Sequence, residues 1–342
     1  KHALGEFMNK LLLCFGTRPE WLKIKPLISV LPRKKYSILF TGQHIDLIEN
    51  VEIDHEIKIE NKKNRLDSVI ISCLNQFPEG SFSGVVVQGD TASAYACALA
   101  AYNRGIDIFY LEAGLRSYDL SNPYPEEAYR QMISRISSVN FCPTSLSRLN
   151  LISEKVSGEN YVVGNTVLDN LLEFKKGNEY GNVVLVTMHR RENHHIIKEW
   201  FTKINELAVK NPNLNFCIPL HPNPNVYKHR ELLKNLTVMK PLDHSQFMKY
   251  LTKCKFVITD SGGIQEEGSF FNKKVIVCRK TTERPEGLGT GHLYLCKKPQ
   301  DLEKIFEEVN NNYIIEAACP YGDGFASEKI YKILRDKYKL NC

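Results

Sequence analysis

The sequence predicts an α/β protein made of two doubly wound, Rossmann-like domains. Short, continuous runs of Val, Ile and Leu alternate with helical patterns along the whole chain, which is typical of parallel sheets covered by helices on both faces. The length of 342 residues is sufficient for two well-buried cores. A polar stretch, residues 173–182, is the best candidate for a linker. We therefore expect one domain at residues 8–173, a second at 174–325 and a terminal helix at 326–342.

The expected elements follow one another in regular alternation. In the first half the expected strands are 11–15, 36–40, 83–87, 106–110, 140–143 and 160–163, with helices after the first strand and at 92–103. In the second half the expected strands are 183–186, 215–218, 256–258 and 274–277. The last helix is amphipathic, with an apolar stripe that includes Ile330 and Leu334. Ligands of open parallel sheets bind at the carboxyl ends of the strands, so the polar residues that follow these strands are the candidates for function.

The composition and charge exclude several classes of protein. The formal net charge is only +6 and there is no concentrated basic run, so we expect no nucleic-acid partner. No apolar run reaches transmembrane length and no signal peptide is visible, so we expect no membrane insertion and a cytoplasmic location. None of the ten cysteines forms a C-x-x-C pair, which favours buried, reduced thiols and no metal site. We interpret residues 1–7 as an expression remnant ahead of a native start at Met8.

A phosphate-binding turn is predicted at Ser261, Gly262 and Gly263, directly after an apolar run. Bare backbone N–H groups at the start of a helix attract phosphate. Glu267, one turn into that helix, is well placed to hold the hydroxyls of a ribose. The same kind of turn also occurs for packing reasons in ordinary α/β domains, so other partners of a nucleotide are needed to support this interpretation.

Cations and histidines follow other expected strands. Arg18 and Lys23 stand at a strand-to-helix junction, where they indicate either diphosphate binding or a solvated helix start. His189 is followed by two arginines, which suggests contact with phosphate. His221 and Arg284 also come after strands of the second half. These side chains could surround a diphosphate.

Three carboxylate segments follow strands of the first half. Asp90 could be functional, although an Asp at this position is more often a helix N-cap. Glu112 follows a buried strand, where a carboxylate needs a partner or a proton. Glu126 and Glu127, with Arg130 nearby, could form an ordinary solvated helix face. If they converge, the three segments form acid/base machinery with shifted pKa values.

Taken together, these segments resemble the non-hydrolysing UDP-N-acetylglucosamine 2-epimerases, two-domain enzymes with the fold of the glycogen-phosphorylase-like glycosyltransferases (GT-B). The resemblance extends over nearly the whole chain and rests on the segments 15–20, 41–44, 89–91, 112–116, 125–127, 164–166, 189–193, 260–267 and 281–286. In this order and spacing the motifs are very specific. The resemblance implies two domains facing a cleft, a last helix that crosses back to the first domain, and a homodimer.

The resemblance also implies the reaction, a reversible C2 epimerisation of UDP-GlcNAc to UDP-ManNAc for the supply of surface-polysaccharide precursors. UDP and the C2 proton are eliminated to give 2-acetamidoglucal, and UDP then adds back. The family's acid/base positions correspond to Asp90, Glu112 and Glu126, and which of them serves which face stays open. A fourth catalytic position corresponds to His189, which stabilises the charge on the β-phosphate. The substrate positions correspond to Arg18, Lys23, Arg130, Phe247 (uracil), Ser261, Gly262, Gly263, Glu267 (ribose) and Arg284. Neither a metal nor a nicotinamide cofactor is implied.

The chain departs from the family pattern at several positions. Gln88 stands where many members carry histidine, and Leu242 stands where some place a polar residue near the uracil. Bacterial members often have a second, activating UDP-GlcNAc site. Gln43 and His221 match positions associated with that site, whereas Asp46 replaces a common glutamine.

Four alternatives remain open at this stage. The first is a hydrolysing epimerase that releases ManNAc and UDP. The second is a glycosyltransferase, which would use one base. The third is a binding protein without catalysis, and the fourth is an epimerase for a further-modified UDP-HexNAc.

Overall fold

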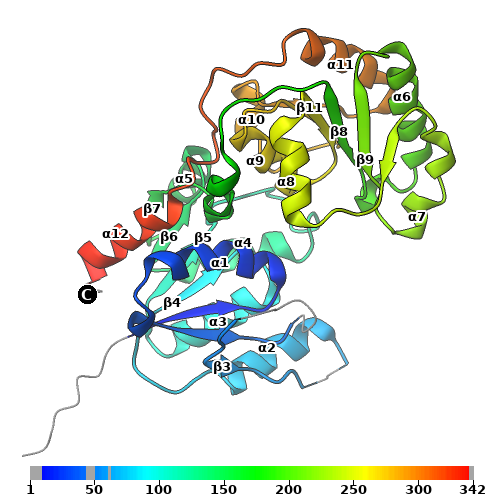
Figure 1. The fold of residues 1–342 in the computed structure, drawn as a ribbon. Coiled ribbons are helices and arrows are strands. Elements are labelled where there is room, and N and C mark those ends of the chain that lie inside the picture. The colour runs from blue at the N-terminus through cyan, green and yellow to red at the C-terminus, as the bar shows by residue number, and fades with distance from the viewer. Residues whose placement is uncertain (1–9, 44–50, 61–62, 339–342) are drawn as a thin grey trace, which may run out of the picture. The chain divides into compact units, whose positions relative to one another are not determined.

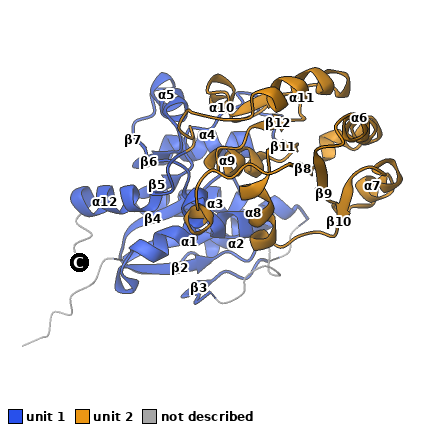
Figure 2. Ribbon diagram, turned by 45° about the horizontal axis from the view of Figure 1, so that its top comes forward, with its two compact units in different colours: residues 1–170, 322–342 blue, residues 171–321 orange. Residues whose placement is uncertain are grey.

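The computed structural model describes residues 10–43, 51–60 and 63–338, which belong to two compact units (Figure 1, Figure 2). Unit 1 comprises residues 1–170 and 322–342, and unit 2 comprises residues 171–321. The expected start at Met8, the departure at Asp46 and the last residues of the terminal helix lie outside the described residues.

Unit 1 is built on a parallel sheet. Within the described residues this sheet has seven strands in the order β3-β2-β1-β4-β5-β6-β7. The strands are β1 Lys10–Phe15, β2 Tyr36–Phe40, β3 His55–Glu56, β4 Phe82–Gln88, β5 Ile108–Leu111, β6 Val139–Cys142 and β7 Glu159–Val162. The central strands are buried along almost their whole length, because helices cover both faces, and this is why they read as continuous apolar runs.

Two groups of helices cover this sheet. The helices of unit 1 are α1 Arg18–Val30, α2 Arg65–Asn75, α3 Ala92–Asn103, α4 Glu126–Ile136, α5 Ser145–Ser153 and α12 Ala326–Tyr338, with a short 3₁₀ turn at Arg33–Lys35. One core contains Cys73 of α2, Cys97 of α3 and Ile133 of α4. The core on the other face contains Leu27 of α1 and Leu334 of α12. The loops at the carboxyl ends of the strands are left free to carry polar side chains.

The terminal helix α12 is anchored to unit 1 by a half-buried carboxylate. Asp169 accepts hydrogen bonds from the backbone N of Ala326 at 3.1 Å and from the backbone N of Ser327 at 2.7 Å. These are N–H groups of the first turn of α12, which have no partner within the helix. Asp169 lies in the 3₁₀ segment Thr166–Phe174, so the chain before unit 2 fixes the helix that follows unit 2.

Unit 2 has the same plan. Among its residues the structure contains a six-stranded parallel sheet in the order β10-β9-β8-β11-β12-β13. The strands are β8 Val183–Thr187, β9 Asn215–Pro219, β10 Thr237–Met239, β11 Phe256–Thr259, β12 Val275–Val277 and β13 Leu293–Leu295. The helices are α6 Ile197–Lys210, α7 Pro224–Tyr227, α8 His244–Lys253, α9 Gly262–Phe270, α10 Glu286–Gly289 and α11 Leu302–Asn311, with 3₁₀ turns at Arg191–Asn193, Arg230–Leu232 and Pro299–Asp301.

The predicted fold class, α/β with two doubly wound Rossmann-like domains, is confirmed. The sequence did not reveal β3, β10 and β13, because these strands have only two or three residues and, unlike the equally short but fully buried β12, are partly exposed. In the described part of the chain, no helix combines the length and the apolar character needed to cross a membrane.

Candidate functional site

The turn between β1 and α1 is built around a buried carboxylate, Glu20. This side chain accepts hydrogen bonds from the backbone N of Gly16 at 3.0 Å, from Thr17 Oγ1 at 2.8 Å and from Thr91 Oγ1 at 2.6 Å. Burial raises the pKa of Glu20, although these hydrogen bonds oppose the shift. Glu20 therefore ties the first turn to the loop after β4 and leaves Arg18 exposed at the start of α1.

Glu112, directly after β5, is surrounded by hydrogen-bond donors. Lys23 Nζ lies 2.5 Å from Glu112 Oε2, Asn165 Nδ2 lies 3.1 Å from Glu112 Oε1, and Gln88 Nε2 donates to Oε2. The backbone of Glu112 has φ +61°, a left-handed conformation that is uncommon for residues other than glycine. The structure thus brings two predicted site residues, Lys23 and Glu112, into direct contact.

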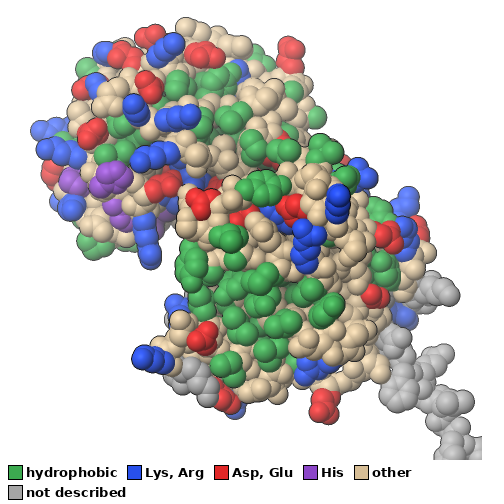
Figure 3. All heavy atoms as spheres, turned by 180° about the vertical axis from the view of Figure 1, so that it is seen from behind, with side chains coloured by type: hydrophobic (Ala, Val, Ile, Leu, Met, Phe, Trp, Pro, Cys, Tyr) green, Lys and Arg blue, Asp and Glu red, His purple; other side chains and the backbone are tan. Residues whose placement is uncertain are grey.

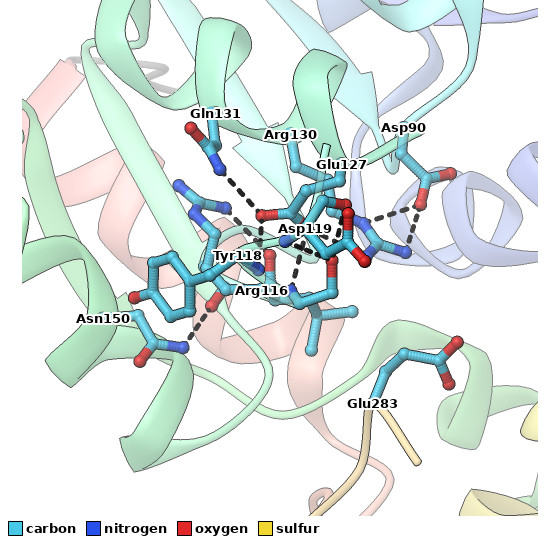
Figure 4. Close-up of polar contacts among 12 residues, drawn as sticks. Asp90, Arg116, Tyr118, Asp119, Glu127, Arg130, Gln131, Asn150 and Glu283 are labelled. Atoms are coloured by element: carbon cyan, nitrogen blue, oxygen red, sulfur yellow. Dashed lines mark hydrogen bonds and ion pairs between the residues drawn. The ribbon is translucent and has the colours of Figure 1, made fainter. Parts of the chain in front are cut away.

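Asp90 and Arg130 form the second direct contact in unit 1. Arg130 Nη2 and Nε lie 2.6 Å and 2.8 Å from Asp90 Oδ2, as the dashed lines in Figure 4 show. Asp90 is not the N-cap of α3, as its position in the sequence would favour, because Thr91 accepts the hydrogen bond from the backbone N of Ala94 instead. Asp90 is therefore available to a ligand and to Arg130.

Glu126, the first residue of α4, is half-buried close to this pair. Burial raises the pKa of Glu126 above its ordinary value, and the negative charge of Asp90 adds to the shift while Arg130 opposes it. A carboxyl group with a raised pKa can hold a proton at a higher pH than an ordinary glutamate, which suits it to act as an acid.

The neighbouring carboxylate, Glu127, has a structural role. It is fully buried and accepts hydrogen bonds from the backbone N of Ser117 at 2.9 Å and of Tyr118 at 3.1 Å (Figure 4). Gln131 Nε2 donates a third hydrogen bond, at 2.9 Å. Glu127 therefore holds the loop that follows Glu112, whereas Glu126, one position earlier on α4, is only half-buried.

In unit 2 a buried carboxylate after β11, Asp260, organises the loop after β8. Asp260 Oδ2 accepts hydrogen bonds from the backbone N of Arg190 at 2.9 Å and from Asn193 Nδ2 at 3.1 Å. The backbone N of His189 lies 3.1 Å from both carboxylate oxygens. Asp260 is fully buried and was not among the predicted site residues. The sequence feature that could have identified Asp260 is its position between an apolar strand and the Ser-Gly-Gly turn.

His189 and His221 lie side by side in unit 2. Their rings are stacked with centroids 5.3 Å apart and an angle of 19° between the planes. Burial lowers the pKa of His189, and the nearby Asp260 only partly opposes this shift. A neutral imidazole at this position can donate one hydrogen bond to a phosphate oxygen without carrying a full charge.

The predicted phosphate-binding turn has the expected form. Helix α9 begins at Gly262, with Ser261 as its N-cap residue, and within the described residues no side chain caps its first turn. A Cβ atom at Gly262 would lie 2.9 Å from Arg284 Nη1 and 3.2 Å from Arg190 Nη2. The N–H groups of Gly262 and Gly263 and the two guanidinium groups therefore surround one small region, which suits a phosphate.

Glu267 and Arg284 flank this turn. Arg284 Nε lies 2.5 Å from Oε1 of the buried Glu266, so the guanidinium is fixed by a partly buried ion pair. Burial and the charge of Glu266 raise the pKa of Glu267 to about 7, while Arg284 opposes the shift. A ligand hydroxyl that donates to Glu267 would favour its ionised form.

The remaining predicted residues are spread over the two units. Phe247 is half-buried on α8 of unit 2. Gln43 of unit 1 accepts a hydrogen bond from Ser93 Oγ at 2.6 Å and lines a cavity of about 660 Å³ that also exposes Lys58, Lys63 and Arg65. Among the described residues, no group of three or more His, Cys, Asp or Glu side chains is arranged to hold a metal ion.

Comparisons with known proteins identify the family of this chain. The family model of UDP-N-acetylglucosamine 2-epimerase matches residues 31–335. The UDP-N-acetylglucosamine 2-epimerase of Campylobacter jejuni is 35% identical, over 96% of this chain and 97% of that protein.

Two solved structures are similar over nearly their full lengths. UDP-GlcNAc 2-epimerase from Neisseria meningitidis bound to UDP-GlcNAc has a TM-score of 0.82 and 33% identity, over 96% of this chain and 100% of the other. S. aureus MnaA, in its structure with UDP, has a TM-score of 0.84 and 32% identity, over 98% of each chain. The chain therefore belongs to the UDP-N-acetylglucosamine 2-epimerase family.

Proposed function

We propose that this protein interconverts UDP-GlcNAc and UDP-ManNAc by elimination and re-addition of UDP, without hydrolysis. The observation that carries the proposal is the set of three carboxylates in unit 1. Asp90 and Glu112 both lie close enough to Arg130 for their charges to raise the pKa of its guanidinium. Asp90 also lies close enough to Glu126 for its charge to add to the rise in pKa that burial causes there. Inversion of C2 requires proton transfer on both faces of the sugar, hence more than one acid/base group. A glycosyltransferase would need one base, and a binding protein would need none.

The proposed reaction balances without a cofactor. In the forward direction an ionised carboxylate accepts the C2 proton, the C1–O bond to UDP breaks, and the electron pair of the C2–H bond forms the C1=C2 double bond of 2-acetamidoglucal. The bonding pair of the C1–O bond leaves with UDP. A protonated carboxyl group on the opposite face then supplies a proton to C2, and the β-phosphate oxygen of UDP attacks C1. The product differs from the substrate only in its configuration at C2.

Unit 2 supplies the groups expected to bind UDP. His189, the N–H groups of Gly262 and Gly263, and Arg284 would stabilise the charge that develops on the β-phosphate as the C1–O bond breaks. Glu267 would accept hydrogen bonds from the ribose, and Phe247 would contact the uracil. Arg18 and Lys23 of unit 1 complete the set of cations for the diphosphate.

The products distinguish the proposal from its alternatives. We expect proton and phosphorus NMR of the protein with UDP-GlcNAc to show UDP-ManNAc and no accumulation of free ManNAc. Free ManNAc with stoichiometric UDP would identify a hydrolysing epimerase. No reaction of UDP-GlcNAc would contradict the proposed substrate and direct attention to modified UDP-HexNAc sugars or to a non-catalytic binder.

A pair of variants tests the carboxylate set. Glu126→Gln should lower kcat by at least about a hundredfold, since one acid/base group contributes 10² to 10⁴. Glu79→Gln, a matched change at an exposed glutamate of unit 1, should keep the activity of the wild type. Equal activity of the two variants would contradict the assignment.

We also propose that UDP-GlcNAc activates the enzyme through Gln43 and His221. The cationic side chains Lys58, Lys63 and Arg65 line the cavity beside Gln43 together with the carboxylate of Glu56, and this positive balance supports an anionic ligand in unit 1. The rate curve for UDP-ManNAc should then depend on added UDP-GlcNAc. A hyperbolic curve without UDP-GlcNAc would contradict activation.

We further propose a cytoplasmic homodimer that supplies precursors for a surface polysaccharide. Figure 3 shows hydrophobic side chains gathered on unit 1, and Ile71 on α2, Tyr102 on α3 and Met132 on α4 are exposed large apolar residues. Such a patch supports a protein contact. Sedimentation of the purified protein should give a dimer and that of Tyr102→Glu a monomer. A monomeric wild type would contradict the dimer.

Deletion of the gene tests the proposed role in precursor supply. We expect ManNAc to be lost from the surface polysaccharide.

A further inference from the structure

The donors around Glu112 come from three separate segments of unit 1. Lys23 lies in α1, Gln88 is the last residue of β4, and Asn165 follows β7. Gln88 of β4 pairs in register with Leu111, the last residue of β5, so it lies beside the point where the chain continues to Glu112. Neither the Gly164-Asn165-Thr166 motif nor the glutamine at position 88 has a role in the function proposed so far.

The amide groups present their N–H ends to Glu112. Asn165 Oδ1 accepts the hydrogen bond from the backbone N of Val167 at 3.2 Å, so the Nδ2 end is the one directed at Glu112. An ammonium group has no acceptor, and so Lys23 also can only donate. Three donors around one carboxyl group favour its ionised form. If the group were protonated, its O–H would point at an N–H donor and a hydrogen bond would be lost.

The donors are shielded from water and fixed in place. Gln88 is 2% exposed and Asn165 is 3% exposed, so water cannot easily replace the hydrogen bonds they make. Thr166 Oγ1 donates to the backbone O of Lys23 at 2.6 Å, and Asn170 Nδ2 donates to the backbone O of Leu22 at 2.7 Å. The segment 164–170 therefore positions both its own amide and the lysine.

We propose that Gln88 and Asn165 are positioning residues that hold Glu112 as an ionised carboxylate, so that it enters the reaction ready to accept a proton. The inference rests on the proposed epimerisation, and it sets Glu112 apart from Glu126, whose pKa is raised by burial. The neutral amide of Gln88 also has a physical consequence. The amide of Gln88 does not titrate between pH 5 and 8, so its hydrogen bond to Glu112 is the same over that range. A histidine at this position would change its charge over the same range.

The kinetic test compares four variants with the wild type. Gln88→Leu keeps the approximate size and removes the donor, and Gln88→His keeps a donor. Asn165→Asp keeps the acceptor for the backbone N of Val167 and replaces the donor by an oxygen. Gln131→Leu is the matched control, because it removes an amide donor from Glu127, a carboxylate outside the reaction. Folding of each variant is checked by thermal unfolding.

For Gln88→Leu and Asn165→Asp we expect kcat to fall about tenfold or more, with KM changed less than about threefold. The reason is that the lost donor stabilises the ionised carboxylate that reacts and does not contact the substrate. The acid limb of the pH profile should move upward by about one pH unit. Gln88→His should recover most of kcat above pH 7, and Gln131→Leu should keep the wild-type profile. Wild-type kcat and an unshifted acid limb in Gln88→Leu would overturn the inference.

A measurement without substrate separates this inference from the proposed function. Carbon NMR of protein labelled at the glutamate carboxyl carbon gives the titration of Glu112, whose signal is assigned by its loss in Glu112→Gln. We expect the midpoint in Gln88→Leu to lie about one pH unit above the wild-type midpoint. Equal midpoints would refute the positioning role even if the enzyme is active. Different midpoints in an inactive protein would retain the positioning role and refute only the reaction.

Discussion

The substitution Asp260→Asn should release the loop after β8 that carries His189. Asn has the same size as Asp, but it has no charge and presents an NH₂ group in place of one oxygen. In the structure both oxygens are occupied by donors, namely the backbone N of His189 at 3.1 Å, the backbone N of Arg190 at 2.9 Å and Asn193 Nδ2 at 3.1 Å. At least one donor must then face another donor.

The magnitude follows from these contacts. A buried donor left without an acceptor costs about 1–3 kcal/mol, and each of the two remaining hydrogen bonds loses about 1 kcal/mol when its acceptor is no longer charged. The free energy that holds the loop closed should fall by about 3–5 kcal/mol. Because each 1.4 kcal/mol is a factor of about ten, amide exchange of the loop should accelerate by about a hundredfold to a few thousandfold.

Hydrogen exchange followed by mass spectrometry on the peptide that contains His189 and Arg190 measures this change. UDP affinity, measured by calorimetry, should fall by at least about tenfold because the imidazole is no longer preorganised. The matched control is Asp243→Asn at the exposed N-cap of α8, where Asn serves as well as Asp. Exchange of the loop within about threefold of the wild-type rate would refute the role given to Asp260.

Three further predictions concern pH and stability. Because the pKa of Glu267 is about 7 in the free protein, and ribose hydroxyls donate to its ionised form, the Kd for UDP should fall about tenfold between pH 6 and pH 8. Glu267→Gln should lose this part of the dependence, and identical pH profiles would contradict the assignment. Gly114→Ala should destabilise unit 1 by about 3 kcal/mol or more in thermal unfolding, because φ is +87° and the new Cβ would lie 2.1 Å from the backbone O of Ser147. Gly105→Ala, with φ +66° and open space, is its control and should cost about 1 kcal/mol, so equal costs would contradict the clash. Asp169→Ala should fray the start of α12 and speed tryptic cleavage there, since it removes the acceptor for the helix N-terminus, and an unchanged cleavage rate would contradict this anchor.

Much of the fold could be predicted because the two sheets are parallel and buried. β1, β4, β8 and β11 are continuous apolar runs, and their order along the chain required helices between them. The short strand His55–Glu56 could not be recognised from the sequence. It pairs with β2, and two residues are too few to show an alternation of apolar and polar side chains.

The site was predicted less completely, because its scaffold depends on contacts between residues far apart in the sequence. Glu20 and Thr91 are 71 positions apart, and Asp260 and His189 are 71 apart, so neither hydrogen-bonded pair has a local pattern. Glu126 and Glu127 are adjacent and chemically alike, and only the rotation of α4 decides that Glu127 is buried.

Motif spacing pointed to the candidate carboxylates and the candidate phosphate-binding turn, but not to the groups that fix them. Gln88 was noticed as a departure from the family pattern, whereas its contact with Glu112 becomes visible only when β4 and β5 are placed side by side. The physical reason is general. The reacting groups of a site can be recognised as single residues in the sequence, whereas the groups that hold them in place are their neighbours in space.

The central claim is that C2 loses its proton to a carboxylate and regains one from solvent-exchangeable groups. Incubation of the protein with UDP-GlcNAc in deuterated water, followed by proton NMR of both sugar nucleotides, tests it most directly. We predict UDP-ManNAc that carries deuterium at C2, together with deuterium at C2 of the recovered UDP-GlcNAc. UDP-ManNAc that keeps its original C2 proton would contradict the account, because the configuration would then have changed without proton exchange at C2.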